Sequence, residues 1–142
     1  MSLNLNALET SFDLVQPRGL ELMDEFYDRL FTMAPSVKPL FPDDMRNQKT
    51  MLLSALVLLR KSLRNLDGVV PHLRAMGARH VRYGARPEHY PVVGVALLQA
   101  MAAVAGPAWK QEYHDAWAEA YGLVAAAMIE GAEEAEALEA AA

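Results

Sequence analysis

Prolines and glycines divide this chain into blocks that are otherwise rich in helix-forming residues. Alanine, leucine and methionine are abundant, while β-branched residues are few and mostly isolated. Because proline and glycine disfavour helix interiors, we expect helices to begin and end near them. Apolar residues recur every three or four positions within each block, which predicts an all-α domain with short corners. The expected helices cover residues 5–15, 18–33, 45–65, 69–83, 87–105 and 108–131.

Composition and charge exclude several classes of protein. The 142 residues suit one domain over residues 1–142, with an acidic tail from about residue 132. A net charge of −5 argues against a nucleic-acid partner, and the absence of cysteine excludes disulfides, thiol nucleophiles and iron–sulfur ligation. The first 16 residues lack a basic signal region, and the longest apolar run, 51–59 with Ser54 inside it, is far shorter than the roughly 20 residues of a membrane span. We expect a soluble, cytoplasmic protein.

Four polar side chains lie where the helical period calls for an apolar one. Tyr27, Gln48, His80 and Tyr90 each have apolar neighbours three or four positions away on both sides. An unpaired buried polar group costs about 1–3 kcal/mol, so each of them needs a partner in the interior.

His80 has two readings from the residues alone. It could be a buried histidine hydrogen-bonded to a backbone carbonyl. A neutral imidazole on a short helix with apolar neighbours also suits the proximal side of a five-coordinate haem. The four histidines form none of the helical zinc motifs.

Tyr27 and Gln48 are weaker signals when each is taken alone, because an inward tyrosine is commonly ordinary core. Together they would bring a phenol O–H and an amide N–H to one apolar cavity. Such donors would retain a bound diatomic ligand that gathers negative charge.

Several short segments, in one colinear order, resemble a known family. They are FYDRLF at 26–31, VKPLF at 37–41, ARHVRYG at 78–84, EHYPVVG at 88–94 and AWAEAYG at 116–122. His80 also precedes Tyr90 by ten residues. The chain is similar over about residues 5–128 to the bacterial single-domain globins and to the globin domain of flavohaemoglobins.

The resemblance implies a three-on-three helical sandwich that holds haem b and binds dioxygen, nitric oxide and carbon monoxide. By position, His80 matches the proximal iron ligand, and Tyr27 and Gln48 match the distal pair. The further haem-contacting positions that the resemblance implies are Phe41, Leu52, Met76, Tyr90, Val93, Trp117 and Tyr121.

Two departures from the family pattern affect the expected chemistry. Flavohaemoglobins place a glutamate against the proximal histidine, and that position falls here on Ala132, so either Glu130 or Glu133 replaces it or the electronic push is absent. The interval from Phe41 to Gln48 is also short, and a one-turn slip would bring Met45 or Leu52 inward instead.

The functional readings that follow from the resemblance differ in their need for electrons. One is reversible dioxygen binding for delivery or storage. The other is a redox enzyme, either a nitric oxide dioxygenase or one with nitrite reductase or peroxidase-like activity. The chain contains no G-x-G-x-x-G nicotinamide motif, so we expect such an enzyme to use a separate flavin reductase. A haem-based sensor and a haem-free interaction domain are less favoured.

Other surface features leave more than one interpretation. Arg79, Arg82 and Arg86 flank the proposed ligand helix, where one could pair with a haem propionate or all could form a solvated basic face. Nothing in the sequence distinguishes a monomer from a homodimer.

Overall fold

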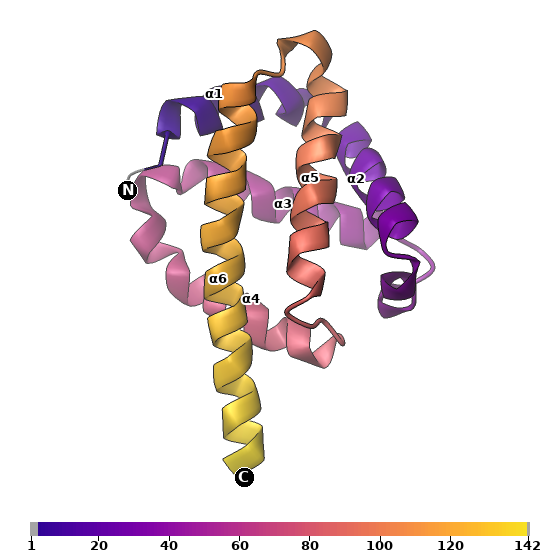
Figure 1. Cartoon of the computed structure of the whole chain (residues 1–142), viewed down its shortest axis with the longest axis vertical. Coiled ribbons are helices and arrows are strands. Elements are labelled where there is room, and N and C mark those ends of the chain that lie inside the picture. The colour runs from indigo at the N-terminus through magenta and orange to yellow at the C-terminus, as the bar shows by residue number, and fades with distance from the viewer. Residues whose placement is uncertain (1–2, 142) are drawn as a thin grey trace.

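The computed structural model describes residues 3–141, and in this range it contains α-helices and short 3₁₀ turns without a strand (Figure 1). The all-α prediction is therefore confirmed. The helices are α1 (Leu5–Val15), α2 (Gly19–Met33), α3 (Arg46–Lys61), α4 (Val70–Arg82), α5 (His89–Ala105) and α6 (Gln111–Ala141). The 3₁₀ turns are η1 (Gln16–Arg18), η2 (Pro35–Leu40), η3 (Leu63–Gly68) and η4 (Gly106–Ala108).

The first two helices begin where the sequence predicts. The Asn4 side chain caps α1 by accepting a hydrogen bond from the Ala7 backbone N–H at 3.2 Å. Leu20, in the first turn of α2, is 67 % exposed. It lies off the buried face, whose members repeat every three to four residues: Leu22, Met23, Phe26, Tyr27 and Leu30.

Two predicted helix boundaries were wrong. The helix expected over 45–65 ends at Lys61, and η3 follows with Asn65 in a non-helical conformation. The last helix, expected to end near Gly131, continues without interruption to Ala141. Alanine and glutamate after Gly131 are strong helix formers, so the acidic tail extends α6 beyond the other helices (Figure 1).

Two pairs of helices form the main layers of the fold, because α2 packs on α5 and α4 packs on α6. At the second crossing the backbones are very close. A Cβ atom at Gly77 would lie 1.8 Å from the Met128 carbonyl oxygen, and one at Gly131 would lie 2.0 Å from the Arg74 carbonyl oxygen. Only glycine permits this approach.

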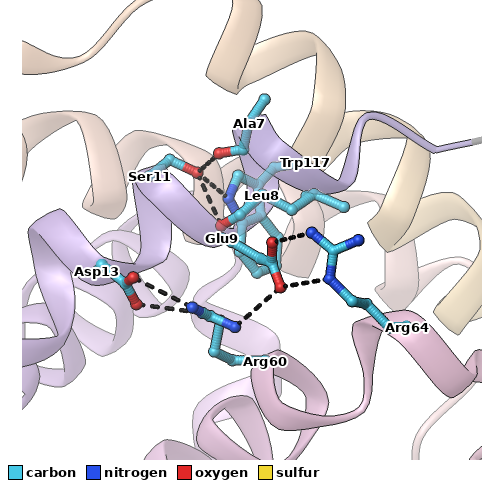
Figure 2. A network of polar contacts seen from close by, with 8 residues as sticks. All are labelled: Ala7, Leu8, Glu9, Ser11, Asp13, Arg60, Arg64 and Trp117. Atoms are coloured by element: carbon cyan, nitrogen blue, oxygen red, sulfur yellow. Dashed lines mark hydrogen bonds and ion pairs between the residues drawn. The ribbon is translucent and has the colours of Figure 1, made fainter.

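Helix α1 is joined to its neighbours by a buried hydrogen bond and by an ionic network (Figure 2). The Trp117 indole N–H donates to the Ser11 hydroxyl at 2.8 Å inside the core. On the surface, Arg60 of α3 bonds both Asp13 and Glu9, and Arg64 of η3 bonds Glu9 through two of its nitrogens. Because Arg60 bonds two carboxylates and the Glu9 carboxylate is shared between two arginines, this network holds the far end of α3 against α1 more firmly than an isolated surface pair would.

One segment is long and apolar enough to span a membrane by length and composition alone, which the longest apolar run did not lead us to expect. It is His89–Ala108, with a mean hydropathy of 1.6. A central core helix has the same composition, and α5 buries Ala96, Leu97, Ala100 and Met101 in the domain core.

Candidate functional site

The first half of the candidate site lies where α2 faces the start of α3. The Gln48 amide Nε2 donates a hydrogen bond of 3.2 Å to the Tyr27 hydroxyl oxygen. Because the phenol oxygen accepts this bond, its own proton is free to be donated to a third group. The predicted distal pair is therefore in direct contact, in the register that places Gln48 inward.

Aromatic rings pack against the Tyr27 ring. The Phe41 ring, just after η2, lies 5.7 Å from the Tyr27 ring and 5.3 Å from the Phe31 ring, both in edge-on geometry. Tyr27 is 3 % exposed, and burial raises the pKa of its phenol, although the Gln48 hydrogen bond opposes the rise. Tyr27 therefore stays a neutral hydrogen-bond donor well above neutral pH.

An ion pair joins the same two helices beside the Gln48–Tyr27 hydrogen bond. Lys49, which follows Gln48 on α3, places its Nζ 2.8 Å from a carboxylate oxygen of Asp24 on α2. Asp24 precedes Tyr27 by three residues, so this contact spans the helices next to the Gln48–Tyr27 bond. It helps to fix the distance between them.

The second half of the site is centred on His80 in α4. Its Nδ1 lies 2.6 Å from the Met76 carbonyl oxygen, one turn earlier on the same helix. A backbone carbonyl can only accept, so Nδ1 carries the proton and the lone pair of Nε2 is left for another partner. This is the tautomer and ring orientation that a metal-ligating histidine requires.

Tyr90 of α5 and Tyr121 of α6 link the two longest helices of the described residues. The Tyr121 hydroxyl donates to the Tyr90 carbonyl oxygen at 2.7 Å. Burial raises the pKa of both phenols, and for Tyr121 the neighbouring Tyr90 adds to the rise. The Tyr121 ring lies against Gly94, where a Cβ would approach it to 2.7 Å.

The inner faces of α3 and α4 fit a flat, largely apolar cofactor. Within the described residues, α3 fully buries only Leu56 and α4 only Gly77, although both helices are strongly amphipathic. Most of their other apolar side chains are half-buried, whereas Met51, Leu58 and Val70 are exposed. The half-buried residues among the predicted cofactor contacts are Phe41, Leu52, Met76, Tyr90, Val93 and Tyr121. One free imidazole lone pair, these apolar faces and the phenol donor together fit haem.

Carboxylates of α6 do not contact His80 in the structure. Arg74 of α4 pairs with Glu130 at 2.5 Å and also with Glu134. Gly77 faces Met128 while Arg74 faces Gly131, so the two helices run past each other in opposite directions. The segment of α4 from Gly77 to His80 therefore runs away from the part of α6 that carries Glu130, Ala132 and Glu133.

Trp117 has contacts in a different part of the molecule. Besides the bond to Ser11, its ring lies 6.1 Å from Phe12 on α1. Neither contact is to another predicted site residue. Its fully buried indole is thus held in the core between α1 and α6.

Tyr83 was not singled out from the sequence, yet it touches the candidate ligand. Its ring lies 5.4 Å from the His80 ring in edge-on geometry. The spacing of three residues on a helix could have indicated this contact, because residues i and i+3 share a face.

Comparisons with known proteins identify the family of this chain. The family model for globins matches residues 24–128. Flavohemoproteins from Bacillus thuringiensis and Bacillus subtilis are 33 % and 30 % identical over 128 residues, which is 88 % of this chain. The chain spans about a third of the length of these curated relatives (31 % and 32 %).

Solved structures also share the fold. A bacterial globin from Campylobacter jejuni is 28 % identical with a TM-score of 0.80, covering 92 % of this chain and 94 % of that one. An engineered carbene transferase made from a proposed nitric oxide dioxygenase of Rhodothermus marinus is 25 % identical with a TM-score of 0.87, and the match covers 99 % of both chains. The chain therefore belongs to the globin family, and the helices of residues 3–141 form a globin fold, the fold of haem proteins that bind diatomic gases.

Proposed function

We propose that this protein binds dioxygen reversibly at a haem b whose iron is held by His80. When bound, haem supplies an iron with one open coordination position for dioxygen, nitric oxide or carbon monoxide. Phe41, Leu52, Met76 and Val93 would enclose the macrocycle, and Tyr90 and Tyr121 would lie on its proximal side. The chain's own contribution is to orient the ligand, retain it and exclude water.

The observation that carries this proposal is the direction of the Gln48–Tyr27 hydrogen bond. Gln48 donates to the phenol oxygen, so Tyr27 has a proton available for a ligand that gathers negative charge. The surrounding aromatic rings lower the local dielectric, which strengthens that hydrogen bond. Slow ligand release follows from this arrangement.

The hydrogen-bond partner of His80 favours retention of bound dioxygen over cleavage of an O–O bond. Its Nδ1 bonds the neutral Met76 carbonyl, whereas a carboxylate partner would raise the basicity of the ring further. With Glu130 held by Arg74, the imidazole pushes less electron density toward the metal than a carboxylate-bonded histidine does. Reversible binding needs no stronger push, but peroxidase-like chemistry does.

Tyr27→Phe tests the proposal. We expect dioxygen to dissociate roughly 10- to 100-fold faster, because a hydrogen bond to a charged group contributes about 1.5–3 kcal/mol. Stopped-flow displacement by carbon monoxide measures the rate.

Because burial raises the Tyr27 pKa above its ordinary value, the wild-type rate should stay constant from neutral to mildly alkaline pH. Tyr113→Phe, a buried tyrosine beside Trp109, is the matched control. An unchanged rate in Tyr27→Phe would overturn the distal assignment.

Nitric oxide dioxygenation is the second candidate function, favoured by the similarity to the Rhodothermus marinus protein. The reaction combines nitric oxide with dioxygen to give nitrate, and one electron must restore ferrous iron in each turnover. We expect sustained, NADPH-dependent consumption of nitric oxide when a flavin reductase is added, measured with a nitric oxide electrode. Consumption that stops after one equivalent would contradict an enzymatic role and leave reversible binding as the function.

A further inference from the structure

An exposed aromatic residue surrounded by arginines lies beside the candidate iron ligand. Tyr83 is 55 % exposed, although its ring packs on the His80 ring at 5.4 Å. Arg79, Arg82 and Arg86 lie four and one residues before it and three residues after it, and all three are exposed. We call these four residues the Tyr83 patch.

The arginines of the Tyr83 patch differ from every other arginine in the chain. The other six each pair with a carboxylate; they are Arg18, Arg29, Arg46, Arg60, Arg64 and Arg74. Within residues 3–141, no carboxylate lies within 4.0 Å of the three patch arginines. In a chain with a net charge of −5, this is a local positive surface whose charge is not neutralised internally.

Such a surface has the composition of a docking site. Tyrosine and arginine are enriched at the residues that dominate binding energy, and unpaired surface charges steer an oppositely charged partner into place. Its location adds a second constraint, since Tyr83 connects the surface to His80 by direct ring contact. In a complex with a partner bound to the Tyr83 patch, only the Tyr83 side chain would separate that partner from His80.

We propose that the Tyr83 patch docks the acidic face of an electron-donating flavoprotein. This inference rests on the proposed function, because ferric iron must be reduced before dioxygen can bind. The step is a single electron transfer: the reduced flavin loses one electron, ferric iron becomes ferrous, and no covalent bond is made or broken. Charge complementarity selects the partner, since a basic or neutral surface would leave the three arginines uncompensated.

Direct binding tests the proposal without relying on turnover. The probe is an acidic flavodoxin titrated against the ferric holoprotein by calorimetry at low and at physiological salt. The double variant Arg79→Glu/Arg82→Glu should weaken binding at least roughly tenfold, and the wild-type affinity should fall as salt rises. Tyr83→Leu should weaken binding severalfold with little change in the salt dependence.

The matched control carries the same change in net charge elsewhere. Lys61 at the end of α3 and Lys110 before α6 are both exposed, and neither lies within 4.0 Å of a carboxylate in the part of the chain that the structure describes. Lys61→Glu/Lys110→Glu should change flavodoxin affinity less than threefold, as expected for weak long-range repulsion. Equal weakening in both double variants would overturn the patch, since only net charge would then matter.

Two further measurements separate this proposal from its alternatives. If an arginine instead pairs with a haem propionate, Arg79→Glu/Arg82→Glu would lose haem faster to apomyoglobin while binding flavodoxin normally, and docking would be rejected. Dioxygen release from the same double variant should equal that of wild type. An unchanged dioxygen dissociation rate in Tyr27→Phe would overturn the proposed ligand retention without changing flavodoxin binding. The two proposals can therefore fail independently, and the two measurements show which one has failed.

Discussion

His80→Gly is expected to weaken haem binding roughly a hundredfold or more, since the sole imidazole ligand is lost. In the structure the His80 ring is already oriented by the Met76 carbonyl, so wild-type protein needs little rearrangement to ligate iron. Glycine leaves a space of imidazole size at this position. Absorption spectra of the reduced and carbon monoxide forms, together with haem transfer to apomyoglobin, measure the effect.

Free imidazole and a second glycine variant control this experiment. Added imidazole should restore the spectrum of His80→Gly by entering the vacated space. His72→Gly introduces the same backbone flexibility two turns earlier on α4, at an exposed side chain. It should leave the spectrum unchanged. A native spectrum in His80→Gly without imidazole would show that another residue ligates the iron.

Gly77→Ala should lower the free energy of unfolding by about 3 kcal/mol, the upper part of the range for overpacked sites. The added methyl group would lie 1.8 Å from the Met128 carbonyl oxygen, and this neighbour is backbone that cannot rotate away. Helices α4 and α6 must therefore separate, which also moves His80. Urea denaturation followed by circular dichroism measures the change.

Gly122→Ala, on the long helix α6 that Gly77 contacts, is the opposite case. Apart from its chain neighbours and the nearby backbone of its own helix, no atom of residues 3–141 lies within 4 Å of the position that its Cβ would occupy. Alanine has the higher helix propensity, so this variant should be about 0.5–1 kcal/mol more stable than wild type. If Gly77→Ala were equally stabilising, the close crossing of α4 and α6 would be wrong.

Helix locations could be predicted from local sequence because proline, glycine and capping residues act within a few positions. Asn4 caps α1, and Pro91 lies in the first turn of α5, where a missing N–H is tolerated. One of the wrong boundaries falls at a residue that tertiary packing requires to be glycine. Gly131 reads as a helix end, yet it is the point at which α6 crosses Arg74.

The candidate site was predictable in part. Polar residues on apolar stripes identified Tyr27, Gln48 and His80, because a side chain's face on a helix follows from its spacing. The partner of His80 was not predictable. Whether His80 donates to the Met76 carbonyl or to a glutamate depends on how α6 crosses α4.

By itself, the sequence determined the all-α class, the order of the helices and the residues that face inward. Those properties depend on propensity and spacing along one segment. Only the tertiary structure decided that Gln48 donates to Tyr27, that Glu130 pairs with Arg74, and that Tyr83 joins His80 to an exposed basic surface. The first two depend on how separate helices cross, and the third depends on which arginines find carboxylates in the folded chain.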